Sequence, residues 1–210
     1  RSQYMFDFEW SNNTLFYGQS TRTRSYFENS ELAAKGVPTG KELEILNAYK
    51  TKLPPEVFTT EYNPPKSDGT GNNRPMLQKA QQLLQEAGWT VTGGKLTKGG
   101  QQMKIEFLNA NPAFERIIGP VVQNLQRLGI DASLRTIDTA QYKERTDNYD
   151  YDVIIDVLAQ SLSPGNEQRD FWSCDSAKEV GGRNSAGICD QTVEELINKI
   201  IADRKSTRLN

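Results

Sequence analysis

The sequence predicts an α/β fold with a parallel sheet at its centre, and three observations indicate it. Residues 104–108 alternate between polar and apolar side chains, and residues 130–137 read as a second strand. An amphipathic helix pattern lies between them, and a third, almost entirely apolar stretch follows at 153–158. This order gives two consecutive βαβ units, whose crossovers are right-handed in nearly all known cases. We expect strands 104–108, 130–137 and 151–158 in one parallel sheet.

Composition narrows the possible functions of the 210 residues. The chain has 25 Lys and Arg against 27 Asp and Glu, so it lacks the excess of positive charge typical of proteins that bind nucleic acid or anionic membranes. It contains no histidine, which excludes Ser-His-Asp and Cys-His catalysis and every His-ligated metal site. Two cysteines alone cannot hold a tetrahedral zinc ion. We expect no metal and no cofactor.

The first third of the chain predicts short helices joined by loops. Residues 1–36 indicate one or two short helices, one of them starting at Ser11-Asn12-Asn13. Residues 41–52 carry apolar side chains at helical spacing until Pro54-Pro55 ends the pattern. Residues 56–73 are rich in Pro, Gly and Asn and indicate a long polar loop.

The helix signals are stronger in the rest of the chain. An apolar stripe runs from Leu77 to Ala87, followed by Gly88 in the position that ends helices. Asn111 and Pro112 begin a helix that should extend to residue 128, with a kink at Pro120. Two further helices are expected, over 140–149 with a cap at Asp138/Thr139, and after Cys189-Asp190.

The carboxyl ends of parallel strands usually hold the ligand in folds of this class. Here that edge comprises 109–111, 138–139 and the loop 159–170, and two helix N-termini face the same way. The loop is dense in hydrogen-bonding groups. The candidate ligand-binding residues in it are Ser161, Ser163, Asn166, Glu167 and Arg169.

Two residues near this loop allow two interpretations each. Arg145 could bind a ligand carboxylate or lie in solvent on its helix, and Trp172 could stack on a ligand or belong to the core. Arg22 and Arg24 are interpreted as surface residues.

Five segments resemble the bacterial family 5 extracellular solute-binding proteins, which serve ABC importers of oligopeptides, dipeptides and nickel. They are FDFEWSNNTLFYGQSTRTRSYFENSELAAKG, LPPEVFTTEY, QKAQQLLQEAGW, RTIDTAQYKERTDNYDYDV and SLSPGNEQRDFW. The resemblance covers nearly all of residues 1–202. The first and last segments are most similar to the Yej-type branch, which is associated with oligopeptide and microcin C uptake.

The resemblance implies a periplasmic-binding-protein-like lobe of type II, with a mixed sheet, formed by residues 1–202. This would be the second, C-terminal lobe of a two-lobed clamp, and this lobe alone should bind peptide weakly or not at all. The implied protein is a periplasmic monomer, not an enzyme, that binds oligopeptides and delivers them to an inner-membrane ABC permease. Relatives commonly carry an Asp in the loop matching 159–167 that receives the peptide ammonium. Ser161 and Ser163 stand there in this sequence, and Glu167 is the nearest carboxylate.

The resemblance also gives the two cysteines a context. In an oxidising periplasm, a bridge from Cys174 to Cys189 would close a loop of about 15 residues and add ~3 kcal/mol of stability. The alternative is two free thiols.

Three further expectations remain open at the sequence level. Residues 203–210 resemble the translation of a sequencing adapter, which would end the natural sequence near Ala202. A carboxylate-dependent hydrolase could use Asp150, Asp152 and Asp156 on one face of a strand, or Glu167. A peptide-sensing receptor or chaperone could share the fold without an importer.

Overall fold

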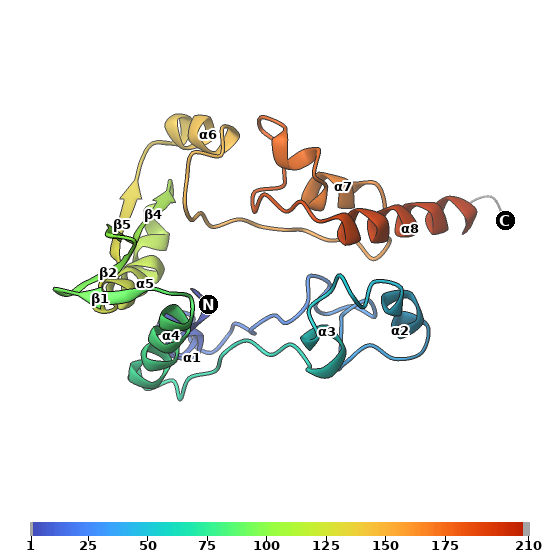
Figure 1. Ribbon diagram of the computed structural model, residues 1–210. Helices are drawn as coiled ribbons and strands as arrows, with labels where there is room; N and C mark the ends of the chain where they lie inside the picture. Colours follow the sequence, from blue (N-terminus) through green and yellow to red (C-terminus); the bar gives the residue numbers. More distant parts are fainter. Residues whose placement is uncertain (1, 208–210) are drawn as a thin grey trace. The chain divides into compact units, whose positions relative to one another are not determined.

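The computed structural model describes the backbone of residues 2–207 and the side chains of residues 3–203. The chain divides into two compact units, each described by itself below (Figure 1). Unit 1 comprises Arg1–Arg22, Pro64–Thr146 and Asp150–Ile155. Unit 2 comprises Thr23–Asn63, Asp147–Tyr149 and Asp156–Asn210.

The centre of unit 1 is the first of the two expected βαβ units. Strands β4 (Lys104–Asn109) and β5 (Asp131–Thr136) pair in parallel along their whole length. Helix α5 (Glu115–Arg127) connects them and follows a short 3-10 turn, η2 (Pro112–Phe114). The Asn111 side chain accepts a hydrogen bond from the backbone N–H of Ala113 at 3.0 Å, so the predicted cap is confirmed.

The third expected strand is reduced to a single bridge. Val153 pairs in parallel with Phe107 of β4, but no strand follows it. Ile155 is 41% exposed and Val157 is 79% exposed, so the prediction of a strand buried on both faces is wrong. The physical reason is that the chain leaves unit 1 after Ile155 and enters unit 2 at Asp156. Beyond Val153 the segment connects two units and does not extend a sheet.

The core of unit 1 forms where α5, helix α4 (Arg74–Glu86) and the turn η1 (Ser2–Met5) pack together. The apolar stripe predicted for α4 is confirmed, and α4 is followed by Gly88 at a φ of +84°. Helix α5 continues through Pro120 as one element. The buried side chains of this core are Met5, Ala80, Leu96, Ile118, Val122, Leu125, Leu128, Ile130 and Ala132.

A small antiparallel sheet, absent from the sequence prediction, completes unit 1. It consists of β1 (Thr90–Thr92), β2 (Lys95–Lys98) and β3 (Gln101–Gln102). Its two turns are the pairs Gly93-Gly94 and Gly99-Gly100, all four at positive φ. Two-residue glycine turns between short strands are a known hairpin signal in sequences. The chain therefore carried the information for this sheet.

Two helix starts in unit 1 test the capping predictions. Helix α1 (Phe8–Leu15) begins before the predicted Ser11, because Asp7 caps it by accepting a hydrogen bond from the Trp10 N–H at 3.0 Å. Helix α6 (Thr139–Asp147) begins as expected, with the Asp138 carboxylate accepting from the next turn.

Unit 2 has little regular structure. The helix expected over 41–52 ends at Asn47 and is shorter than predicted, and part of the expected loop after residue 159 is helical. Its elements are α2 (Gly40–Asn47), α3 (Glu56–Thr59), α7 (Glu167–Trp172), the turn η3 (Ser176–Lys178) and α8 (Gln191–Thr207). The predicted tail of 203–210 extends past α8 into residues 208–210, outside the described residues.

A disulfide closes one loop of unit 2. Cys174 and Cys189 are bonded, with their Cα atoms 4.3 Å apart. Within the loop, the Asn184 side chain is 1% exposed and donates to the backbone oxygens of Ser173 and Ile188, at 2.9 and 2.7 Å. One buried amide and one covalent bond thus hold the same loop closed.

The hydroxyl of Tyr149 contacts the loop that the disulfide closes. Its oxygen lies 3.1 Å from the backbone oxygens of both Ser176 and Glu179. Burial, together with the charge of Glu179, raises the pKa of the Tyr149 hydroxyl above its ordinary value. Because the pKa of the Tyr149 hydroxyl is higher in the folded state than in the unfolded state, protonated Tyr149 favours the folded state. This contribution of Tyr149 to the free energy of unfolding is complete below pH ~10, and it is lost as the pH rises through the folded-state pKa.

We expect Tyr149→Phe to lower the free energy of unfolding by about 1 kcal/mol at pH 8, the usual net worth of one hydrogen bond. The difference between the two proteins should shrink at pH 11, where wild-type tyrosine loses its proton on unfolding. Urea unfolding at both pH values measures this. An equal difference at the two pH values would contradict the assigned role.

No helix among the described residues is long and apolar enough to cross a membrane.

Candidate functional site

The predicted ligand-binding residues fall in both units. Arg145 belongs to unit 1, whereas the five residues of the loop belong to unit 2. Within unit 2 they lie on the irregular segment that precedes α7 and on the first turns of that helix. The five are Ser161, Ser163, Asn166, Glu167 and Arg169.

The loop presents its polar side chains in two ways. Ser161, Ser163 and Asn166 are exposed. Glu167 is half-buried, and its carboxylate accepts a hydrogen bond from the Gly165 N–H at 2.7 Å, which fixes the turn before α7. Arg169 donates to the Asn198 side chain of α8 at 2.7 Å. The first three side chains are therefore accessible, and the last two also stabilise the loop.

Behind the loop, two glutamines form a chain of hydrogen bonds. Gln168 is 3% exposed; its amide nitrogen donates to the Gln160 oxygen at 2.7 Å, and its oxygen accepts from the Trp172 indole at 3.2 Å. The Gln160 amide nitrogen is buried and donates to no described group. Most buried donors in folded proteins have acceptors, so the Gln160 amide nitrogen is an exception to that pattern.

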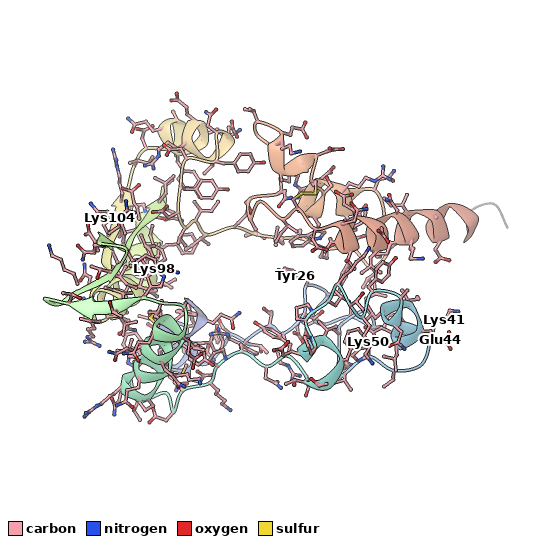
Figure 2. The ribbon with its side chains drawn as sticks, in the orientation of Figure 1. Tyr26, Lys41, Glu44, Lys50, Lys98 and Lys104 are labelled. Carbon is pink, nitrogen blue, oxygen red and sulfur yellow. A yellow bond between two sulfur atoms is a disulfide. The ribbon has the colours of Figure 1, made fainter. Side chains whose placement is uncertain are left out.

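Aromatic rings continue the cluster towards the surface. The Tyr26 ring packs on the Trp172 ring with centroids 4.8 Å apart, and the centroid of the Phe171 ring lies 6.0 Å from that of Trp172. Tyr26, labelled in Figure 2, is 63% exposed. The Trp172 ring therefore packs against other rings of unit 2, and its stacking on a ligand stays a prediction.

A pocket of about 370 Å³ opens beside Tyr26, lined by Thr23, Arg24, Ser25, Tyr26 and Tyr62. The Glu28 carboxylate shapes its wall by accepting from the N–H groups of Arg24 and Ser25, at 2.7 and 3.3 Å. The Arg24 bond is the main reason that the pKa of Glu28 is lowered. The Arg24 guanidinium itself contacts Asn63 at 3.2 Å. These groups give the pocket cationic, aromatic and hydroxyl character.

Arg145 is paired within unit 1. Its guanidinium donates to Glu106 at 3.0 Å and to Asp150 at 2.8 Å, and the side chain is 23% exposed. Burial alone would lower the pKa of Arg145, but the two carboxylates outweigh it and raise the pKa. Arg145 thus ties the end of α6 to β4, whatever else it contacts.

The carboxylates considered for hydrolysis do not share a strand face. Asp150 and Asp152 lie in unit 1, where Asp152 accepts from the Glu106 N–H at 2.8 Å. Asp156 lies in unit 2 and accepts from the Ser185 hydroxyl at 2.6 Å. The expected strand that would align them is not formed, so this prediction is wrong. Among the described residues, no group of three or more His, Cys, Asp or Glu side chains could hold a metal ion.

Sequence reasoning missed the residues that build the cluster. Gln160, Gln168 and Tyr26 lack a charge or a motif that would single them out. Gln168 shares the segment of the predicted loop, and its i, i+4 spacing to Trp172 on a helix was the available signal. Tyr26 comes from a distant part of the sequence, and only the fold brings it to Trp172.

The edge of the sheet in unit 1 is closed by its own side chains. Asn109, at the end of β4, is 4% exposed and donates to the Asn111 oxygen at 2.9 Å and to the Thr136 hydroxyl at 3.1 Å. The predicted segment 109–111 therefore supports the carboxyl ends of both strands.

Comparisons with known proteins identify relatives over almost the whole chain. A "Probable peptide-binding protein YejA" of Agrobacterium fabrum is 47% identical over 200 residues, covering 94% of this chain and 33% of the relative. An "Uncharacterized protein YejA" of Escherichia coli is 38% identical, with 94% and 33% covered. The chain spans about a third of the length of these curated relatives.

Solved structures agree on the fold. The oligopeptide-binding protein AppA of Bacillus subtilis, solved with a nonapeptide, matches 98% of this chain and 36% of its own, with a TM-score of 0.62 at 21% identity. A periplasmic oligopeptide-binding protein of Thermotoga maritima matches 95% of this chain and 34% of its own, with a TM-score of 0.63 at 14% identity. At such identities the likeness shows the fold alone.

The fold is therefore that of a periplasmic-binding-protein-like lobe of mixed α/β structure. The family described as "Bacterial extracellular solute-binding proteins, family 5 Middle" matches residues 3–179, which include the loop, the glutamines and the aromatic cluster. Its description names solute binding and no reaction. The chain belongs to the family 5 extracellular solute-binding proteins of bacteria.

Proposed function

We propose that the chain forms the second lobe of a two-lobed periplasmic protein that binds oligopeptides and delivers them to an inner-membrane ABC permease. Family membership supports the class of protein, and the printed name of the Agrobacterium fabrum relative supports peptides as its solute. The resemblance to the Yej-type branch extends the proposal to microcin C as one cargo.

The observation that carries the proposal is the arrangement around α7. Exposed Ser161, Ser163 and Asn166 precede it, and the Tyr26–Trp172 pair lies in the same unit. A peptide offers backbone donors and acceptors together with side chains that pack on aromatic rings. The polar loop can supply the hydrogen bonds, and the aromatic pair can supply the packing surface.

Glu167 is the carboxylate that we assign to the peptide ammonium. In a longer protein that contains this chain, Glu167→Gln should weaken binding of an unmodified peptide by tens of fold or more, because loss of one partner of a buried charge pair typically costs about 2–5 kcal/mol. Glutamine keeps the oxygen that accepts from the Gly165 N–H, so the turn should persist. Calorimetric titration with tetra-alanine measures the change.

Two comparisons separate this role from a general effect. Acetylation of the peptide N-terminus should weaken binding to wild type and have little further effect on Glu167→Gln. The matched control is Glu44→Gln on α2, whose carboxylate is 70% exposed and pairs only at the surface with Lys41, at 3.5 Å (Figure 2). It should bind like wild type. Equal affinity of wild type and Glu167→Gln for the free peptide would refute the assignment.

A further inference from the structure

The pocket beside Tyr26 has no part in the role proposed above for the loop 161–169. Its volume of about 370 Å³ is within the range of small-ligand sites in proteins. All the residues that line it belong to unit 2. Two of them are aromatic, and Tyr26 is 63% and Tyr62 54% exposed. The pocket therefore offers ring surface that a ligand can reach from solution.

Arg24 is the cation of this pocket, and half of its side-chain surface is exposed. Its Nη1 atom donates to the Asn63 side chain at 3.2 Å. Among the residues that the structure describes, no group accepts a hydrogen bond from Nε or Nη2. These two nitrogens form one edge of the planar guanidinium, and their parallel N–H groups match the two oxygens of a carboxylate. A carboxylate is therefore the group that this edge fits best.

The carboxylates of the protein around Arg24 leave that edge open. Glu61 lies 3.8 Å from Nη1 with both side chains about half exposed, and exposed pairs of this kind contribute little. Glu61 also accepts from the Gly36 N–H at 3.1 Å. Glu28 accepts from the backbone N–H of Arg24 at 2.7 Å, and Lys35 is the second cation that acts on it. The charges around the pocket thus balance, and the forked donors of Arg24 favour an anion.

The pocket is connected to the candidate peptide-binding loop by contacts within unit 2. Tyr26 packs on Trp172, and the Trp172 indole donates to the Gln168 oxygen at 3.2 Å. The Gln168 amide nitrogen in turn lies 3.5 Å from Glu167 Oε1. A peptide that places its ammonium group at Glu167 would therefore lie on the same unit as a second, cationic site.

We propose that this pocket binds a carboxylate group of the peptide, with Arg24 as its donor. The apolar part of the ligand that carries the carboxylate packs on the Tyr26 ring. The inference rests on the proposed function and adds a specificity-determining residue to it. The carboxylate has two possible sources: the C-terminus of the peptide, or the side chain of an aspartate or glutamate in it.

The first experiment titrates the chain with N-acetyl-phenylalanine and follows the NMR signals of the Tyr26 ring. We expect a saturable shift, and binding of the uncharged N-acetyl-phenylalanine amide weaker by about tenfold or more, because the charge-assisted pair with Arg24 is lost. Arg24→Gln should weaken binding of the acid to a similar extent. Arg24→Lys keeps the charge without the forked edge, so its affinity should lie between those of wild type and Arg24→Gln.

Two further variants keep the test decisive. Glu61→Gln removes the negative charge that competes for Arg24 and should tighten binding, an outcome opposite in sign to that of Arg24→Gln. Glutamine keeps an oxygen for the Gly36 N–H. Lys41→Gln is the control, because this cation on α2 is 83% exposed and does not line the pocket (Figure 2). It should leave binding unchanged.

The second experiment uses a longer protein that contains this chain and distinguishes the two sources by calorimetry. If the C-terminus is the source, amidation of tri-alanine should weaken binding to wild type and have little further effect on Arg24→Gln. If a side chain is the source, amidated Ala-Glu-Ala should bind more tightly than amidated Ala-Gln-Ala. That preference should disappear in Arg24→Gln.

Failure of this inference can be told from failure of the proposed function. The carboxylate site is refuted if N-acetyl-phenylalanine leaves the Tyr26 signals of the chain unshifted, or if the amide or Arg24→Gln gives equal binding. Peptide affinity that is unchanged in Arg24→Gln would also overturn the inference, and would leave the Glu167 assignment standing. A longer protein that binds no peptide would refute the proposed function, and with it the assignment of this pocket to a peptide.

Discussion

Replacing Cys174 and Cys189 together with serine is expected to lower the free energy of unfolding of unit 2 by about 3 kcal/mol. The disulfide spans 15 residues in sequence, and cross-linking a loop of that length removes about this much chain entropy from the unfolded state. Unit 2 depends on it because much of its chain is irregular and few of its apolar residues are fully buried. Urea unfolding followed by Trp172 fluorescence, in a Trp10→Phe, Trp89→Phe background, measures the change.

Reduction supplies the control for this prediction. Dithiothreitol should destabilise the disulfide-bonded protein by a similar amount and leave the double-serine protein unaffected. The two substituted tryptophans lie in unit 1, so the signal reports unit 2. A double-serine protein within about 0.5 kcal/mol of wild type, the range of ordinary surface substitutions, would show that the Asn184 hydrogen bonds suffice to hold the loop.

Gly129→Ala should have an effect of similar size on unit 1. Gly129 has a φ of +82°, and an added Cβ would lie 2.7 Å from both the Gly94 oxygen and the Leu96 nitrogen. The left-handed conformation costs a non-glycine residue about 1–2 kcal/mol. The backbone clash adds about 1–3 kcal/mol as overpacking. We expect a total loss of about 3 kcal/mol, measured by urea unfolding with Trp89 as the reporter.

Gly93→Ala separates the two contributions. Gly93 has a φ of +58°, but nothing lies within 4 Å of an added Cβ. This variant should lose only the conformational part, about 1 kcal/mol. If both variants lose the same free energy of unfolding, the backbone clash expected at residue 129 costs nothing. The hydrogen bond from the Leu96 N–H to the Gly129 oxygen would then persist with an alanine at that position.

The sequence predicted the parts of unit 1 that local pattern controls. The stripe of α4, the crossover helix α5 and the parallel pair β4 and β5 follow from periodicity and caps. The stretch after Val153 does not form the predicted strand, because apolar composition is common to buried strands and to connections between compact units. Composition does not say where a chain leaves a sheet, and only the tertiary structure shows that unit 1 ends at Ile155.

Unit 2 was harder to predict because its order depends on contacts between distant residues. Tyr26 packs on Trp172 across almost 150 residues of sequence, and Asn184 holds a loop through backbone oxygens. Neither contact leaves a periodic pattern. For the candidate site, the loop 161–169 could be chosen from composition, whereas the glutamine pair behind it required the fold.

We propose that the loop 161–169 receives a peptide and that Glu167 holds its ammonium group. The test is a crystal structure of a longer protein that contains this chain, with a bound oligopeptide. We expect the Glu167 carboxylate about 3 Å from the peptide nitrogen, a hydrogen-bonding distance. We also expect Ser161, Ser163 or Asn166 in contact with the peptide. A peptide bound without any contact to residues 161–169 would show that this loop is not the binding site.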